Sequence, residues 1–125
     1  MKLKVFISQP MAGMTDAEIL ERRKELIELV KNRYADKEIE VIDSFTKSEE
    51  IVGKGRIAML GDSIAMMADA DIVIFAKNWR KSKGCMVEHE VCVQYKIMRI
   101  YEELISVPYT HQKQEVENHI YWSDL

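Results

Sequence analysis

Residues 71–95, DIVIFAKNWRKSKGCMVEHEVCVQY, decide the fold of this chain. The apolar, β-branched run at 72–76 predicts a short strand that is buried on both faces of a sheet. A polar loop follows at 77–83, and Ser82 is a suitable N-cap for a helix that continues to about residue 95. A buried strand followed by a loop and a helix is the repeating unit of a parallel α/β sheet.

The predicted helix carries a carboxylate among its apolar residues. At about 100° per residue, one apolar face is expected to pack on the sheet. Its members are Cys85, Val87, Val91, Cys92 and Tyr95. Glu88 lies inside this face, whereas His89 lies about 100° further round and is expected to face solvent. A carboxylate in a packing face is costly unless it has a partner or a function. Glu88 is therefore either a rim carboxylate tied to a lysine or to backbone amides, or a functional group.

The composition is that of an ordinary globular protein, and we expect residues 1–125 to form a single domain. Of these 125 residues, 47% are hydrophobic and 31% are charged, which allows one core without metal or disulfide staples. The 18 basic and 21 acidic residues are interspersed and give a net charge of −3, which disfavours a nucleic-acid binder. No stretch has the length and apolarity of a membrane span or a signal peptide.

The two cysteines, Cys85 and Cys92, lie on one predicted helix. Their spacing of seven residues corresponds to about 10 Å along a helix, which is too far for a disulfide. We therefore expect reduced thiols and a cytoplasmic protein.

Strands and helices alternate along the rest of the chain. A strand at 3–8 is followed by the loop QPMAGM at 9–14, and TDAE at 15–18 is a capping box for a helix over 16–34. The charged residues 21–25 are predicted to form the solvated face of that helix. The next elements are predicted as a strand at 38–42, a helix at 56–68 and a strand at 97–101.

Three segments allow more than one interpretation. The polar connection 43–55 is either a binding loop or lid, or plain surface. Residues 102–107 form a fifth strand or a helical turn, and residues 111–120 are predicted to be helical. Tyr121 and Trp122 are expected to pack on this subunit or on a neighbour.

This alternation predicts a three-layer α/β/α protein of the flavodoxin-like (Rossmann-like) class, with a parallel sheet of four to five strands. Right-handed crossovers favour the strand order 2-1-3-4, in which the first and third strands are neighbours. Ligands bind at the carboxyl ends of such strands. Loops 8–15 and 77–84 are therefore expected to form one crevice, with Glu88 one turn into the helix behind it.

Three sequence features resemble the nucleoside 2-deoxyribosyltransferase superfamily, in particular a small bacterial and phage branch related to 2′-deoxynucleoside 5′-phosphate N-hydrolases. They are KVFISQPMAGMT at the first strand, ADADIVIFA at the third, and the motif S-x-G-x-x-x-E-x-x-x-small at Ser82, Gly84, Glu88 and Cys92. Each feature is weak alone, but their order and spacing together are specific. The resemblance covers about residues 3–101.

The resemblance implies that Glu88 is a catalytic nucleophile. It would attack the anomeric carbon of a (deoxy)ribosyl ring as the nucleobase leaves, which forms a glycosyl-enzyme ester. Water or a second base would then resolve this ester with retention of configuration. Ser82 and the amides at the helix start would bind a 5′-phosphate or a ribose hydroxyl, and Gly84 would let the backbone approach the ligand.

The other site residues include departures from the family pattern. The family's helix aspartate corresponds to Ser63, with Asp62 one residue away, and Asp71 matches the strand aspartate or simply caps the preceding turn. Trp79 either stacks on a base or sugar or is an interface residue. The expected catalytic residues are Glu88, Asp71 and Asp62, and the expected substrate-binding residues are Ser8, Gln9, Pro10, Met11, Gly13, Ser63, Trp79, Ser82 and Gly84.

The expected function is cleavage or transfer of the N-glycosidic bond of a (deoxy)nucleoside or its 5′-monophosphate. The change at Ser63 motivates an alternative, a non-catalytic module that binds a nucleotide or a nucleotide-derived signal. An FMN-binding flavodoxin is disfavoured because loop 8–15 lacks a Ser/Thr-rich phosphate cradle. We expect no metal and no cofactor, since His111 and His119 have no ligand spacing. The resemblance also implies a homo-oligomer in which a neighbour completes the site.

Overall fold

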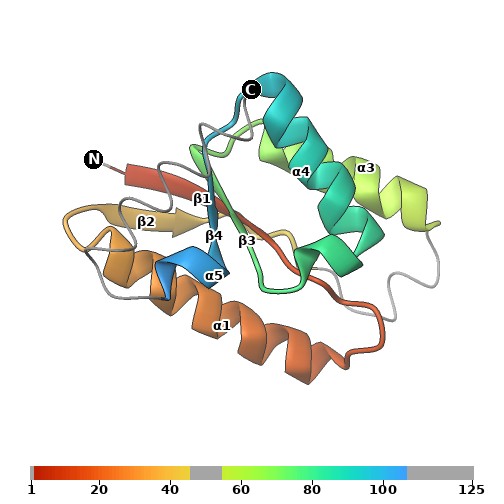
Figure 1. The fold of residues 1–125 in the computed structure, drawn as a ribbon, viewed down its shortest axis with the longest axis horizontal. Coiled ribbons are helices and arrows are strands. Elements are labelled where there is room, and N and C mark those ends of the chain that lie inside the picture. Colours follow the sequence, from red (N-terminus) through yellow and green to blue (C-terminus); the bar gives the residue numbers. More distant parts are fainter. Residues whose placement is uncertain (1, 46–54, 107–125) are drawn as a thin grey trace.

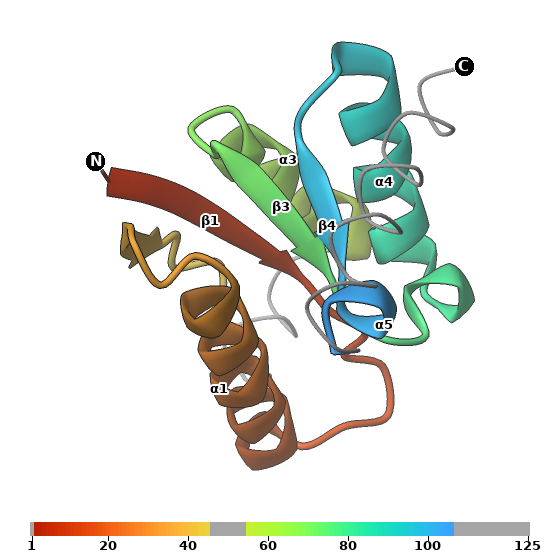
Figure 2. The same cartoon turned by 60° about the vertical axis from the view of Figure 1, so that its left-hand side comes forward.

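The computed structural model describes residues 2–45 and 55–106, which form a parallel sheet between two layers of helices (Figures 1 and 2). Within these residues the elements are β1 (Lys2–Ser8), α1 (Asp16–Arg33), β2 (Glu38–Val41), α3 (Arg56–Met67), β3 (Ile72–Phe75), the 3₁₀ turn η1 (Trp79–Lys81), α4 (Lys83–Tyr95), β4 (Arg99–Tyr101) and α5 (Glu102–Ile105).

The strand order is β2-β1-β3-β4, and every neighbouring pair is parallel. This is the predicted flavodoxin-like order, in a three-layer α/β/α arrangement with four strands among the described residues. The central pair is β1 and β3, aligned from Val5 opposite Ile72 to Ser8 opposite Phe75. Because the two strands are parallel and in register, Ser8, the last residue of β1, lies beside the start of the β3–α4 connection.

Each face of the sheet has its own hydrophobic core. On one face, Leu26 of α1 and Ile105 of α5 pack with Ile72 and Ile74, while on the other a second core includes residues of α3 and α4. The second core contains Phe6, Met67, Val73, Phe75, Trp79, Cys85, Cys92 and Tyr101. Successive residues of β3 point to opposite faces, so a strand that is buried along its whole length contributes to both cores.

The two helix starts that the sequence predicts are confirmed. At α1, Thr15 Oγ1 accepts a hydrogen bond from the Glu18 amide at 3.2 Å, and Glu18 Oε1 accepts one from the Thr15 amide at 3.0 Å. At α4, Ser82 Oγ accepts a hydrogen bond from the Cys85 amide at 3.3 Å. These caps satisfy backbone donors that have no partner inside the helix.

The segment after β4 is a short helix, α5 (Glu102–Ile105), so a helical turn and not a fifth strand follows at this point. Most of the 43–55 connection, the predicted helix 111–120, and Tyr121 and Trp122 lie outside the described residues. In the described part of the chain, no helix has both the length and the apolarity needed to cross a membrane.

The face that α4 turns towards the sheet differs from the predicted one. Cys85, Glu88 and Cys92 are buried, but Val87 is 42% exposed and Tyr95 is 79% exposed. The centre of the buried face therefore lies between Glu88 and Cys85, and the helix is rotated away from the side of Val87 and Tyr95.

His89 was predicted to face solvent, and this is wrong. It is half-buried, its ring stacks on Trp79 with centroids 4.1 Å apart, and its Nε2 lies 2.6 Å from the Tyr101 hydroxyl. Packing of His89 against the neighbouring aromatic rings, including Phe75 with its ring centroid 4.9 Å away, explains the rotation of α4. The imidazole ring of His89, which has a hydrogen-bond partner, packs on the inward side of α4 in place of the smaller Val87 side chain.

Candidate active site

The centre of the candidate site is a hydrogen bond between the end of β1 and the middle of α4. Ser8 Oγ donates to Glu88 Oε1 at 2.7 Å, although the two residues are 80 positions apart in the sequence. Ser8 is 1% exposed and Glu88 is 7% exposed. The fold thus places a carboxylate at the carboxyl end of the central strands, where ligands of this fold class bind.

Burial raises the pKa of Glu88 to about 7, and the hydrogen bond from Ser8 acts in the opposite direction without cancelling this effect. Removal from water disfavours the charged form of a carboxyl group, whereas a donated hydrogen bond favours it. Near neutral pH, the folded protein therefore holds Glu88 partly ionised and partly protonated. Such a group can serve as a nucleophile or exchange a proton in this pH range.

Ser82 and Cys85 extend the cluster around Glu88 towards the start of α4. Burial raises the pKa of the Cys85 thiol, while hydrogen bonding to Ser8 and Ser82 lowers it and the nearby Glu88 carboxylate raises it. The thiol is thus close to both hydroxyl groups. The helix start adds a partial positive charge, which suits an anion or a polar ligand group.

Gly84 in the first turn of α4 is not required by contacts within the described chain. A Cβ placed there would meet only Leu60 Cδ1, at 3.9 Å, which is an ordinary van der Waals distance. The backbone at Gly84 is also not in the left-handed region, because Gly13 is the glycine with a positive φ among the described residues. The small residue therefore leaves open the close approach that the sequence motif predicts.

The β1–α1 loop contributes residues of different exposure. Gln9 is buried, and its Nε2 donates to the Ile19 carbonyl at 3.2 Å, which ties the loop to α1. Pro10 is half-buried, while Met11 is 40% exposed and accepts a turn hydrogen bond from Met14. Gly13 has a φ of 78°, a left-handed conformation that glycine adopts without strain.

The structure does not bring Asp71 to Glu88. Asp71 is exposed and precedes β3, so it lies at the amino end of the strand, whereas Ser8 lies at the carboxyl end of the neighbouring strand. Its Oδ2 accepts a hydrogen bond from the Lys4 amide at 2.8 Å, and its own amide donates to the Lys4 carbonyl at 2.8 Å. These contacts tie Asp71 to the neighbouring strand β1.

Asp62 and Ser63 lie on α3, beside α4. Asp62 is exposed and Ser63 is half-buried. The helix that carries them does approach the site, since Leu60 lies next to Gly84.

Trp79 is buried, with 6% of its surface exposed. Its ring lies against Phe75 and His89, and the Arg80 guanidinium lies 4.6 Å from its centroid. In this arrangement the ring faces contact protein groups, so a base or sugar would reach Trp79 only after a rearrangement of the loop. Trp79 packs on its own subunit, between β3 and α4.

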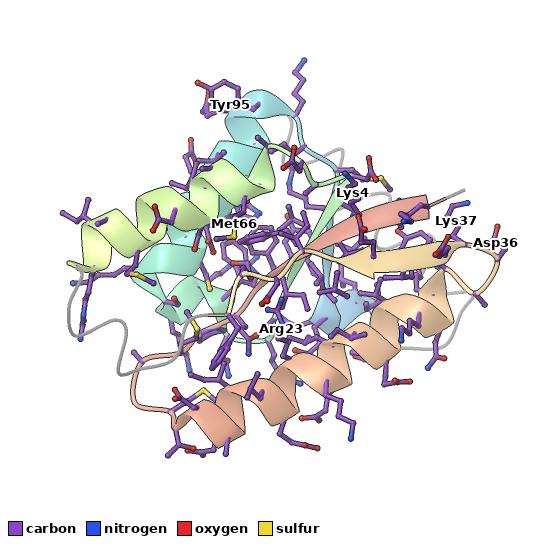
Figure 3. The ribbon with its side chains drawn as sticks, turned by 180° about the vertical axis from the view of Figure 1, so that it is seen from behind. Lys4, Arg23, Asp36, Lys37, Met66 and Tyr95 are labelled. Carbon is purple, nitrogen blue, oxygen red and sulfur yellow. The ribbon has the colours of Figure 1, made fainter. Side chains whose placement is uncertain are left out.

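Sequence reasoning missed Arg23, which lies at the same end of the sheet. It was predicted to be on the solvated face of α1, but it is only 8% exposed. Its guanidinium donates to the Ile42 carbonyl at 2.7 Å and to Ser44 Oγ at 3.3 Å, and Figure 3 shows its side chain extending from α1 towards the segment after β2. Burial lowers its pKa and the charge of Asp43 raises it. Because Arg23 sits in a run of charged residues, no local signal distinguished it.

Within residues 2–45 and 55–106, no group of three or more His, Cys, Asp or Glu side chains is arranged to hold a metal ion. The chemistry at this edge of the sheet is that of a buried carboxylate, hydroxyl groups, a thiol and a helix N-terminus.

The fold and this site define a flavodoxin-like α/β protein with a buried carboxylate behind the carboxyl ends of its two central strands. Residues 3–101 match DUF4406, a domain of unknown function, and the chain belongs to this family. The chain matches no curated protein and no solved structure. The family description names no activity.

Proposed function

We propose that this protein cleaves or transfers the N-glycosidic bond of a (deoxy)nucleoside or its 5′-monophosphate, with Glu88 as the nucleophile. The observation that carries the proposal is the Ser8–Glu88 hydrogen bond, which fixes a buried carboxylate at the ligand-binding edge of the sheet. The order of Ser82, Gly84 and Glu88 supports it, because these residues also resemble the motif of the nucleoside 2-deoxyribosyltransferase superfamily.

The proposed reaction has two steps. The Glu88 carboxylate attacks the anomeric carbon, the C–N bond breaks, and the base departs with the bonding electron pair and takes up a proton. Water or a second base then attacks the same carbon and releases the carboxylate, with retained configuration. The acceptor decides between hydrolysis and transfer. Ser8 holds the carboxylate in place, and Ser82 with the amides of the α4 start binds the sugar hydroxyl or phosphate.

The proposal assigns catalysis to Glu88 and leaves the proton donor open. Asp71 is tied to the Lys4 backbone at the other end of the sheet, and Asp62 is exposed on α3. We further propose a small-molecule nucleoside or nucleotide as the partner, and a homo-oligomer that acts in the cytoplasm.

The test compares the wild-type protein with Glu88→Gln on a panel of nucleosides and 5′-monophosphates, with and without an acceptor base. Chromatography follows release and exchange of the base. We expect the wild type to be active and Glu88→Gln to lose at least about a thousandfold in rate. Glu21→Gln, the same change at an exposed position on α1, is the matched control and keeps the activity. Base release that survives Glu88→Gln would contradict the nucleophile assignment.

A specific observation favours a second candidate, a non-catalytic module that binds a nucleotide or a nucleotide-derived signal. Asp71, the strand aspartate expected from the family pattern, is bonded to the Lys4 backbone at the opposite edge of the sheet from Ser8 and Glu88. Calorimetry with the same panel separates the two candidates. Tight binding without turnover by the wild type supports the binding module, and multiple turnovers exclude it.

A further inference from the structure

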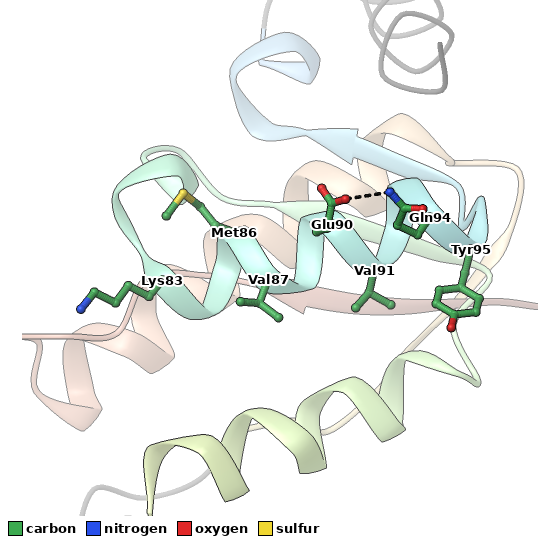
Figure 4. A pocket seen from close by; sticks show the side chains of 7 residues that line it. All are labelled: Lys83, Met86, Val87, Glu90, Val91, Gln94 and Tyr95. Carbon is green, nitrogen blue, oxygen red and sulfur yellow. Dashed lines mark hydrogen bonds between the residues drawn. The ribbon is translucent and has the colours of Figure 1, made fainter.

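α4 carries a second surface feature, outside the buried contact between Glu88 and Ser8. A shallow groove runs along α4, here termed the α4 outer face, and Figure 4 shows its side chains, with Val87, Val91 and Tyr95 on the side towards α3. This face consists of Lys83, Met86, Val87, Glu90, Val91, Gln94 and Tyr95. Three of its apolar side chains are well exposed, with Met86 at 46%, Val87 at 42% and Tyr95 at 79%. Apolar side chains gathered on one exposed helix commonly mark an interaction surface.

The charges on this face have an unusual placement for an isolated helix. Lys83 occupies the first turn of α4, where the helix dipole disfavours a cation. Glu90 lies seven residues later, two helical turns away and on the same side. Neither residue forms an ion pair with another residue of 2–45 or 55–106. Glu90 accepts only a hydrogen bond from Gln94, at 2.8 Å.

We propose that the occupant of the α4 outer face is a second copy of this chain, with the two α4 helices antiparallel about a two-fold axis. When that axis passes next to Met86 and Val87, Lys83 of each copy lies opposite Glu90 of the other. Met86 and Val87 of the two copies then meet at the centre of the contact, and Tyr95 lies beyond the end of the partner helix. An isologous contact requires such a self-complementary surface, and an apolar centre with a charged rim is the usual anatomy of an interface.

The size of this face sets the strength of the contact. α4 has 13 residues, and a standard interface buries about 800 Å² on each partner. One face of a single helix is smaller than that. The dimer is therefore concentration-dependent, and the two symmetric charge pairs contribute an appreciable share of its stability. This inference does not depend on the chemistry proposed for Glu88.

The test is a charge exchange, measured by sedimentation of the full chain over a range of concentrations. Lys83→Glu alone places carboxylates opposite each other at both ends of the contact, and Glu90→Lys alone places two cations there. Each single variant is expected to weaken dimerisation by about tenfold or more. The double variant K83E/E90K restores both pairs with reversed polarity and is expected to return the dimer.

Lys31→Glu is the control, because it makes the same charge change at an exposed position on α1, in the opposite helix layer. It is expected to leave dimerisation unchanged. A wild type that is monomeric at every concentration overturns the proposal and leaves the face to another occupant, such as residues 107–125 of the same chain. Single variants that dimerise like the wild type, or a double variant that stays monomeric, overturn the proposed antiparallel pairing.

Discussion

Glu88 combines burial with an ionisable group, and this combination makes the stability of the protein depend on pH. The unfolded chain releases this proton near pH 4.5, whereas the folded protein holds it to about pH 7. Between these values the folded state binds more protons, so stability falls as the pH rises. The stabilisation from this group is complete below pH 4.5 and is lost as the pH rises through 7.

We predict that Glu88→Gln removes this dependence. A shift of about 2.5 pH units corresponds to about 3 kcal/mol. The free energy of unfolding of Glu88→Gln, relative to that of the wild type, should therefore rise by about this amount between pH 4.5 and 8. Denaturant unfolding at several pH values measures the difference. Glu21→Gln, at an exposed position on α1, should show no such trend. A constant offset between Glu88→Gln and the wild type would mean that Glu88 ionises normally in the folded state.

Ser8 provides the next prediction, because its hydroxyl donates to the Glu88 carboxylate. This hydrogen bond lowers the pKa of Glu88 against the larger effect of burial. Ser8→Ala should therefore raise the pKa of Glu88 further, above about 7. Carbon NMR titration of the Glu88 carboxyl measures it directly. In the proposed enzyme, the rise of kcat/KM with pH should move to higher pH in the same variant. An unchanged titration curve would show that the 2.7 Å contact does not stabilise the ionised form.

At the level of single residues, sequence reasoning succeeded where a residue stood out from its local pattern. Glu88 was conspicuous as a carboxylate among apolar neighbours, and it is buried. Arg23 and His89 were missed, because a charged residue in a charged run and a histidine beside the predicted face give no local signal. Their burial depends on partners from distant segments, such as the Ile42 carbonyl for Arg23.

At the level of elements, the start of α4 connects helix stability to the site. Ser82 caps the helix through the Cys85 amide. We predict that Ser82→Ala lowers the free energy of unfolding by about 1 kcal/mol, a usual value for loss of an N-cap. Ser82→Asp keeps a capping oxygen and is expected to recover most of this loss. Denaturant unfolding of both variants tests the prediction, and equal stabilities for Ser82→Ala and the wild type would refute the role of the cap.

The elements themselves were largely predictable, and their orientation was less so. Capping residues and apolar runs gave the starts of α1 and α4 and the position of β3 to within a residue or two. The rotation of α4 was not predictable from apolar periodicity, because the half-buried His89 faces inward in place of Val87 and Tyr95, which are exposed. Polar residues with specific hydrogen-bond partners can replace apolar ones in a packing face, and the sequence does not name the partners.

At the level of the whole molecule, the order β2-β1-β3-β4 followed from two constraints. Alternating strands and helices require parallel neighbours, and right-handed crossovers leave few arrangements of four strands. The convergence of Ser8 and Glu88 is a consequence of that order, since it makes β1 and β3 neighbours. The same topology moves Asp71 away from them, because a residue before a strand and a residue after its neighbour lie at opposite edges.

Glu102 links three separate segments at the carboxyl edge of the sheet. It follows β4, and its Oε1 accepts hydrogen bonds from the Lys77 amide at 2.7 Å and from the Arg22 guanidinium of α1. Burial by itself raises the pKa of Glu102, but the hydrogen bonds and positive charge of Arg22, together with the Lys77 amide, outweigh burial and lower it. The stabilisation from Glu102 is therefore present above the pKa of the unfolded chain, near 4.5, and is lost as the pH falls through the lower folded value.

We predict that Glu102→Ala destabilises the protein by about 2 kcal/mol at pH 7, because it leaves the Lys77 amide and Arg22 without this acceptor. The difference from the wild type should shrink as the pH falls from 4.5 through the lower pKa of Glu102 in the folded protein, where the carboxyl group becomes protonated. Hydrogen exchange at the Lys77 amide should also become faster, since Lys77 begins the connection that leads from β3 to Ser82 and α4. Glu103→Ala is the matched control, as Glu103 is the exposed neighbour. Equal losses in the two variants, with unchanged exchange at Lys77, would mean that Glu102 does not hold these segments together.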